Sequence, residues 1–259
     1  GSEMCIRDRL GAAVATFFNG SNFIVDKVNM TDRMMPVISS WANGWHGLDA
    51  FGDPWNLILG LAVFFLARLL GNLYFINNIR DNELIPRCRR QLISDAVPFL
   101  VFFLAFVIRT LLKDGFAVVA ETGEIIMEPY KYFHNLTAMP VLLIVFLVGV
   151  VGVLYGLGMS IFKTSYTKGI WFSGIGTVLT VLALLLSVGY NDTAYYPSVA
   201  DIQSSLTLAN SCSSKFTLKT MAYVSILVPF VLAYIVYAWR AIDNKPITSK
   251  ELEEDEHAY

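Results

Sequence analysis

Five long apolar stretches constrain the fold of this chain more than any other feature. A helix that crosses a membrane needs about 20 mostly apolar residues, and the segments 55–76, 96–112, 139–162, 169–190 and 220–239 meet this requirement. Of the 259 residues, 55% are apolar and 15% are charged, whereas a soluble domain carries roughly 25% charged residues. We therefore predict an all-α polytopic membrane protein: a transmembrane helix bundle with five complete spans.

The composition also excludes several classes of protein. The formal net charge of −2 and the lack of a clustered basic patch argue against nucleic-acid binding. The high apolar content excludes a disordered chain. The three cysteines are widely separated and form no CxxC pair, so we expect no metal site and no disulfide framework. His46, His134 and His257 all lie outside the predicted spans, which leaves no histidine within the membrane to bind haem iron.

The two ends of the chain differ from its middle. The segment Ser2–Arg9 resembles a translated sequencing adaptor, so we treat residues 1–9 as non-native; a genuine polar N-terminal loop is the alternative. The apolar run 10–18 is too short to span and is interpreted as the end of a partial first helix. The natural protein is then expected to begin upstream. Residues 240–259 form an acidic tail.

Basic residues predict the orientation in the membrane. Lys and Arg gather in the segments 77–94 and 163–168 and in the tail, and such segments stay in the cytoplasm. The C-terminus is therefore expected inside, and the segments 19–54, 113–138 and 191–219 outside. We interpret these outer loops as solvated caps, with a docking surface for a partner as the alternative.

Small residues predict how two of the spans pack. Helices in lipid associate through small residues and buried polar groups. The third span carries three glycines on one face, the fourth carries three hydroxyl residues on one face, and their short connection makes the two spans antiparallel neighbours. We expect these faces to meet: Gly149, Gly152 and Gly156 against Ser173, Thr177 and Thr180.

Few polar groups fall within the predicted spans. Arg68 lies deep in the first span and Asn72 lies four residues later on the same face. Such an arginine must face protein or water: it contacts a buried carboxylate, a quinone oxygen or a haem propionate, or else it is structural and snorkels to the interface. Asp95 opens the second span as a helix N-cap, or alternatively marks a point where protons enter, and Pro98 then falls in the first turn. Arg109 is expected at the outer interface.

Several strings in the chain point to a known family. They occur in the same order over residues 10–259 and include PWNLILGLAVFFLARLLGNLYFINNI (54–79), MEPYKYFHN (127–135), NDTAYYPS (191–198), DIQSSLTL (201–208) and VPFVLAYIVYAWR (228–240). Together they closely resemble subunit II of the cytochrome bd quinol oxidase in the form found among Bacteroides-like bacteria. The match covers the latter two-thirds of a usual subunit, which is built of two four-helix bundles plus one helix.

The resemblance implies a function in aerobic respiration. The family's complex lies in the bacterial cytoplasmic membrane, oxidises quinol and reduces oxygen to water, and generates a membrane potential without pumping. Two haems b and one haem d belong to subunit I, with which subunit II forms a heterodimer. Subunit II supports the haem subunit, contributes to a proton path and in some members holds a structural quinone. The family's proton-path carboxylate lies in early helices that are absent here, and the resemblance assigns no role to Arg68 or Asn72.

The sequence leaves one alternative from another functional class. A fragment of a secondary transporter or channel would also be a helix bundle, but transporters usually carry midplane charges and paired broken helices. We expect neither metal ligands nor catalytic residues in this chain, so it would take part in the oxidase reaction only as one subunit of the complex.

Overall fold

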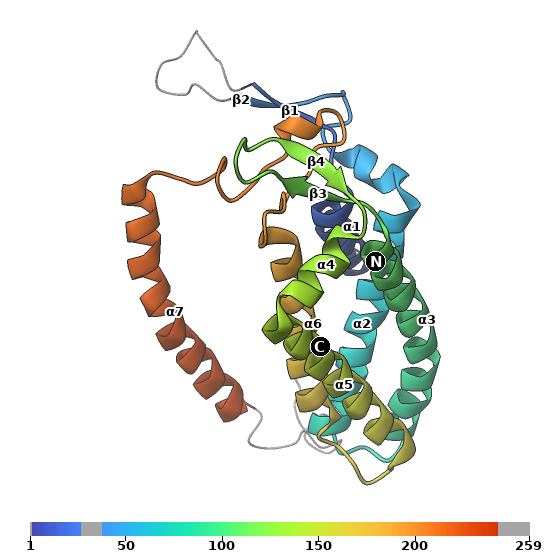
Figure 1. Ribbon diagram of the computed structural model, residues 1–259. Coiled ribbons are helices and arrows are strands. Elements are labelled where there is room, and N and C mark those ends of the chain that lie inside the picture. The colour runs from blue at the N-terminus through green and yellow to red at the C-terminus, as the bar shows by residue number, and fades with distance from the viewer. Residues whose placement is uncertain (1, 27–37, 243–259) are drawn as a thin grey trace.

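The computed structural model describes residues 2–26 and 38–242. Five of its helices are long and apolar enough to cross a membrane, which confirms the predicted all-α polytopic membrane fold (Figure 1). These helices are α2 (Pro54–Asn78), α3 (Leu84–Leu112), α5 (Pro140–Phe162), α6 (Gly169–Gly189) and α7 (Lys215–Ile242). The acidic tail from residue 243 onward, including His257, lies outside the described residues.

Helix α3 begins at Leu84, well before the predicted start at residue 96. The prediction that Asp95 caps a helix was therefore wrong, as was the placement of Pro98 in a first turn, because both lie inside α3. Hydropathy located only the most apolar part of this helix. Its first turns carry several arginines, which lower the hydropathy of this segment. Cys88 and Leu92 are nevertheless buried and lie on a helix face that continues into the span.

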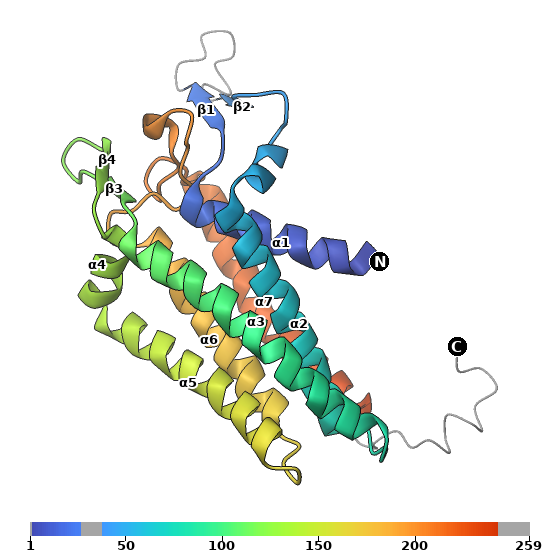
Figure 2. The ribbon, with the colours of Figure 1, turned by 90° about the vertical axis from the view of Figure 1, so that its right-hand side faces the viewer.

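Helix α1 (Ser2–Asn19) runs obliquely to the other helices (Figure 2). It packs closely on α2, since a Cβ atom added at Gly11 would lie 2.7 Å from the Cα of Gly60. Ala15 and Phe18 are buried in a core cluster that α2 and α3 complete. The segment 10–18 is thus an integral part of the bundle.

The three loops predicted to face one side do meet at one end of the bundle (Figure 1). Single β-bridges join Ser21 to Ser198 and Ala117 to Thr193, so that segments far apart in sequence form one cap. The cap contains two antiparallel hairpins, a short helix and two 3-10 turns: β1 (Phe23–Asp26) with β2 (Ile38–Trp41), β3 (Gly115–Val118) with β4 (Ile125–Glu128), α4 (Lys131–Ala138), η1 (Leu48–Gly52) and η2 (Ile202–Ser204).

Helices α5 and α6 approach each other closely through small residues, as predicted. Added Cβ atoms at Gly149 and Gly156 would collide with Thr180 and Ser173, respectively. The centre of the α6 face is Gly176 rather than the predicted Thr177: a Cβ there would lie 2.6 Å from the carbonyl oxygen of Gly149. The Thr177 hydroxyl instead donates to the carbonyl of Ser173 in its own helix, at 2.7 Å.

Helix α7 is set apart from the other helices (Figure 1). None of its residues is buried. Near its C-terminal end, the Trp239 ring meets the Tyr74 ring of α2 edge to face, with centroids 6.2 Å apart.

Candidate functional site

The most concentrated polar site within the membrane helices lies between α2 and α3. The Asp95 carboxylate accepts from the Nε of Arg68 at 3.1 Å, the Nδ2 of Asn72 at 3.4 Å and the Nε2 of Gln91 at 3.0 Å. Arg68 and Asn72 share a face of α2 one turn apart, and Gln91 and Asp95 share a face of α3 in the same way. The structure therefore brings together all three predicted site residues.

Burial differs sharply between the two charged partners. The Asp95 side chain is 3% exposed, whereas the Arg68 side chain is 36% exposed. The Arg68 guanidinium also lies 5.6 Å from the ring centroid of Phe64. Of the roles considered for Arg68, the structure shows the contact to a buried carboxylate. A carboxylate withdrawn from water in this way needs a cation and hydrogen-bond donors beside it, and α2 provides both.

Sequence reasoning placed Asp95 at a helix end and so missed this pairing. The signal that could have revealed it is the spacing of the residues before the span. Cys88, Leu92, Ala96 and Phe99 recur at intervals of three and four and are all buried, which is the pattern of one continuous helix face. Asp95 falls on that face.

A second arginine of α3 holds a connection in place at the end of the bundle away from the cap. The Arg89 guanidinium donates to four backbone carbonyls, those of Ser160, Lys163, Thr164 and Tyr166. These carbonyls belong to the end of α5 and to the turn before α6. Arg89 therefore ties α3 to the α5–α6 hairpin. From the sequence alone, the arginines of this segment served only to predict the orientation in the membrane.

Buried polar groups also organise the cap. The Asn135 side chain of α4 is fully buried: its Nδ2 donates to the Ser187 carbonyl at 2.7 Å and to the Thr193 hydroxyl at 2.8 Å, and its Oδ1 accepts from Asn191 at 3.0 Å. This amide joins α4, the end of α6 and the loop beyond it. It holds the cap on the bundle.

A half-buried carboxylate in the cap, that of Glu128, has two basic partners. Glu128 lies 3.0 Å from the Nδ1 of His134 and 3.0 Å from the Nζ of Lys131. The hydrogen bond from His134, followed by that from Lys131, lowers the pKa of Glu128 below its ordinary value against the opposing effect of burial. His134 is therefore engaged at the surface of the cap.

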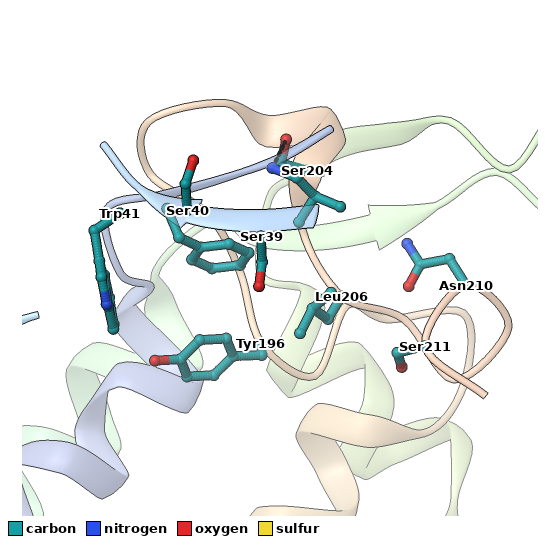
Figure 3. A pocket seen from close by; sticks show the side chains of 10 residues that line it. Ser39, Ser40, Trp41, Tyr196, Ser204, Leu206, Asn210 and Ser211 are labelled. Atoms are coloured by element: carbon teal, nitrogen blue, oxygen red, sulfur yellow. Dashed lines mark hydrogen bonds between the residues drawn. The ribbon is translucent and has the colours of Figure 1, made fainter. Parts of the chain in front are cut away.

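A hollow of about 720 Å³ in the cap lies between the β1–β2 hairpin and the segment that follows η2 (Figure 3). Among residues 2–26 and 38–242, its lining consists of aromatic, aliphatic, hydroxyl and amide side chains. The Tyr196 hydroxyl lies 3.0 Å from that of Ser21, and the Tyr196 ring stacks on Phe23. These partners make Tyr196 a structural residue of the cap.

The cofactors implied by the resemblance can be compared with the residues present. Residues 2–26 and 38–242 contain no group of three His, Cys, Asp or Glu side chains that could hold a metal ion. An apolar crevice of about 310 Å³ among α2, α3, α5 and α6 is lined in part by Thr177 and Thr180. The hydroxyls of both threonines donate to carbonyls of their own helix. Among the described residues that line this crevice, no side chain has a free hydrogen-bond donor for a quinone oxygen.

The fold and site define a class: a polytopic helical membrane protein with a half-buried ion pair between two spans and a folded cap at one end. A family model described as cytochrome bd terminal oxidase subunit II matches residues 6–242. The chain therefore belongs to the cytochrome bd terminal oxidase subunit II family. A search of curated proteins finds no match for this sequence.

Proposed function

We propose that this chain is the non-haem-ligating partner subunit of a quinol oxidase that reduces oxygen to water. The observation that carries the proposal is the family match over residues 6–242, which contains all five apolar helices. In this function the chain forms a heterodimer with subunit I in the bacterial cytoplasmic membrane and supports the subunit that carries the haems.

The distribution of histidines supports placing the haems in the partner. None of the five apolar helices contains a histidine, and His134 of α4 is engaged with Glu128. The haems would supply the electron-transfer and oxygen chemistry of the complex. The residues of this chain would position and stabilise the subunit that binds them.

The cluster around Asp95 would serve as a fixed contact between α2 and α3. Three donors converge on one carboxylate, and this arrangement favours a structural role over a point where protons enter. The α5–α6 connection and the start of α3 lie at the end of the bundle opposite the cap (Figure 1). The connection carries Lys163 and Lys168, and the first turns of α3 carry three arginines. The positive-inside rule then supports a cytoplasmic C-terminus and an external cap.

Co-expression tests this proposal directly. The tagged chain is produced together with the neighbouring candidate subunit I gene, purified in mild detergent and assayed for haem absorbance and quinol-dependent oxygen uptake. We expect a haem-containing heterodimer that consumes oxygen only when quinol is present. Cells that express subunit I without this chain provide the matched control and should yield less assembled, haem-loaded enzyme. A haem-free single species that moves a solute would replace the proposal with the transporter interpretation.

A further inference from the structure

Two cations meet at the cap end of α3. The Nη1 of Arg109 and the Nζ of Lys113 donate to the same oxygen, Oδ1 of Asn19, at 3.0 and 3.2 Å. Lys113 also donates to the carbonyl of Phe18 at 2.6 Å. The Arg109 guanidinium lies 4.6 Å from the ring centroid of Trp55. The Lys113 ammonium also lies 5.8 Å from the ring centroid of Tyr132. Neutral oxygens and aromatic ring faces are therefore the partners of these two positive charges.

No carboxylate neutralises this pair by direct contact. The ion pairs within 4 Å in the described parts of the chain include neither Arg109 nor Lys113. Burial, followed by the charge of Arg109, lowers the pKa of Lys113 from 10.5 to about 8. Asp53 and Asp114 act in the opposite direction, but their effect is smaller. Asp53 also caps α2 by accepting from the backbone N–H of Trp55. Positive charge at this position is thus incompletely compensated within the described protein.

The same two cations border an open, otherwise apolar hollow. Its volume is about 440 Å³, and Trp55, Ala105, Ile108 and Leu112 complete its lining. Ile108 and Leu112 are 54% and 61% exposed and lie on the outer face of α3, which would contact lipid in a membrane. Cationic groups therefore lie at the end of an apolar strip, with a tryptophan at the level of the headgroups.

We propose that this hollow binds an anionic phospholipid of the cap-side leaflet. The phosphodiester would accept hydrogen bonds from Arg109 and Lys113, and an acyl chain would lie along Ala105, Ile108 and Leu112. Arginine is suited to such a contact because its planar guanidinium presents several N–H donors to phosphate oxygens. The hollow lacks the wall of polar donors that would enclose a free phosphate ion. The proposal depends on the membrane location of the chain and not on the oxidase reaction.

Native mass spectrometry of the full chain in detergent tests the proposal. Phosphatidylglycerol and phosphatidylcholine with identical acyl chains are titrated separately, and inorganic phosphate is added as a competitor. We expect phosphatidylglycerol to be retained more strongly by the wild type. Arg109→Gln should lower that preference about fivefold, the effect of one basic side chain on an anionic lipid surface. Arg90→Gln, which removes an exposed arginine at the other end of α3, should leave the preference unchanged.

Three results would overturn the proposal: equal retention of the two lipids, equal loss in the two variants, or displacement of the lipid by millimolar phosphate alone. A second measurement needs no charge-removing variant. Phosphatidylglycerol brominated on its acyl chains should quench the fluorescence of the wild type more than that of Trp55→Phe, and brominated phosphatidylcholine should show a smaller difference. An equal difference for both lipids would also count against the site.

Discussion

The cluster around Asp95 yields the sharpest prediction. Replacing Asp95 with Asn removes the negative charge and leaves Arg68 charged between the helices. Breaking a fully buried ion pair by removing one partner costs about 3–5 kcal/mol. Because the Arg68 side chain is 36% exposed, we expect a smaller loss here, about 2–4 kcal/mol. Glu83→Gln is the control: its ion pair with Arg87 has both side chains more than three-quarters exposed, so the loss should be at most about 1 kcal/mol.

The assay is the free energy of unfolding in mixed detergent micelles, followed by circular dichroism. Arg68→Leu should also destabilise the protein, because the Asp95 carboxylate then remains buried with only amide donors. The double variant Arg68→Leu with Asp95→Asn should be more stable than the sum of the two single losses predicts, since no unpaired charge remains. Additive losses, or an Asp95→Asn variant as stable as Glu83→Gln, would refute the argument that the two charges compensate each other.

Three further predictions concern packing, the cap and pH. Gly176→Ala should cost about 1–3 kcal/mol by forcing α5 and α6 apart, whereas Gly174→Ala, with nothing within 4 Å of the added carbon, should be neutral in the same unfolding assay. Asn135→Ala should cost about 2–3 kcal/mol, because buried partners lose their hydrogen bonds. The control Asn82→Ala, at an exposed position, should leave the stability unchanged. Faster protease cleavage of the cap in Asn135→Ala than in Asn82→Ala would report the difference. Lys113 has a folded-state pKa lowered from 10.5 to about 8, so the folded protein binds fewer protons than the unfolded chain between these values. Stability in neutral detergent should rise by about 1–2 kcal/mol from pH 8 to pH 10.5, a rise that Lys113→Met should lack; an equal rise in the variant would contradict this assignment.

The sequence alone determined the class of fold because hydropathy is a local property. Whether a segment such as α5 or α6 can cross a bilayer depends on its own length and composition, and both helices begin and end within a residue of the predicted bounds. The small-residue faces that join α5 and α6 were also predictable, since a short connection makes the two helices antiparallel neighbours. Several sequence strings that occur in the same order sufficed to indicate the family, which the match over residues 6–242 then showed.

Only the tertiary structure decided what the polar residues do. The partner of Arg68 lies 27 positions away on another helix, and its identity depends on how α2 and α3 are rotated about their axes, which no local pattern specifies. The sharing of Asn19 by Arg109 and Lys113 likewise requires α1 to end beside α3. Whether a charge is buried depends on side chains that come from distant segments of the chain. For that reason the sequence alone predicted the spans but not the sites.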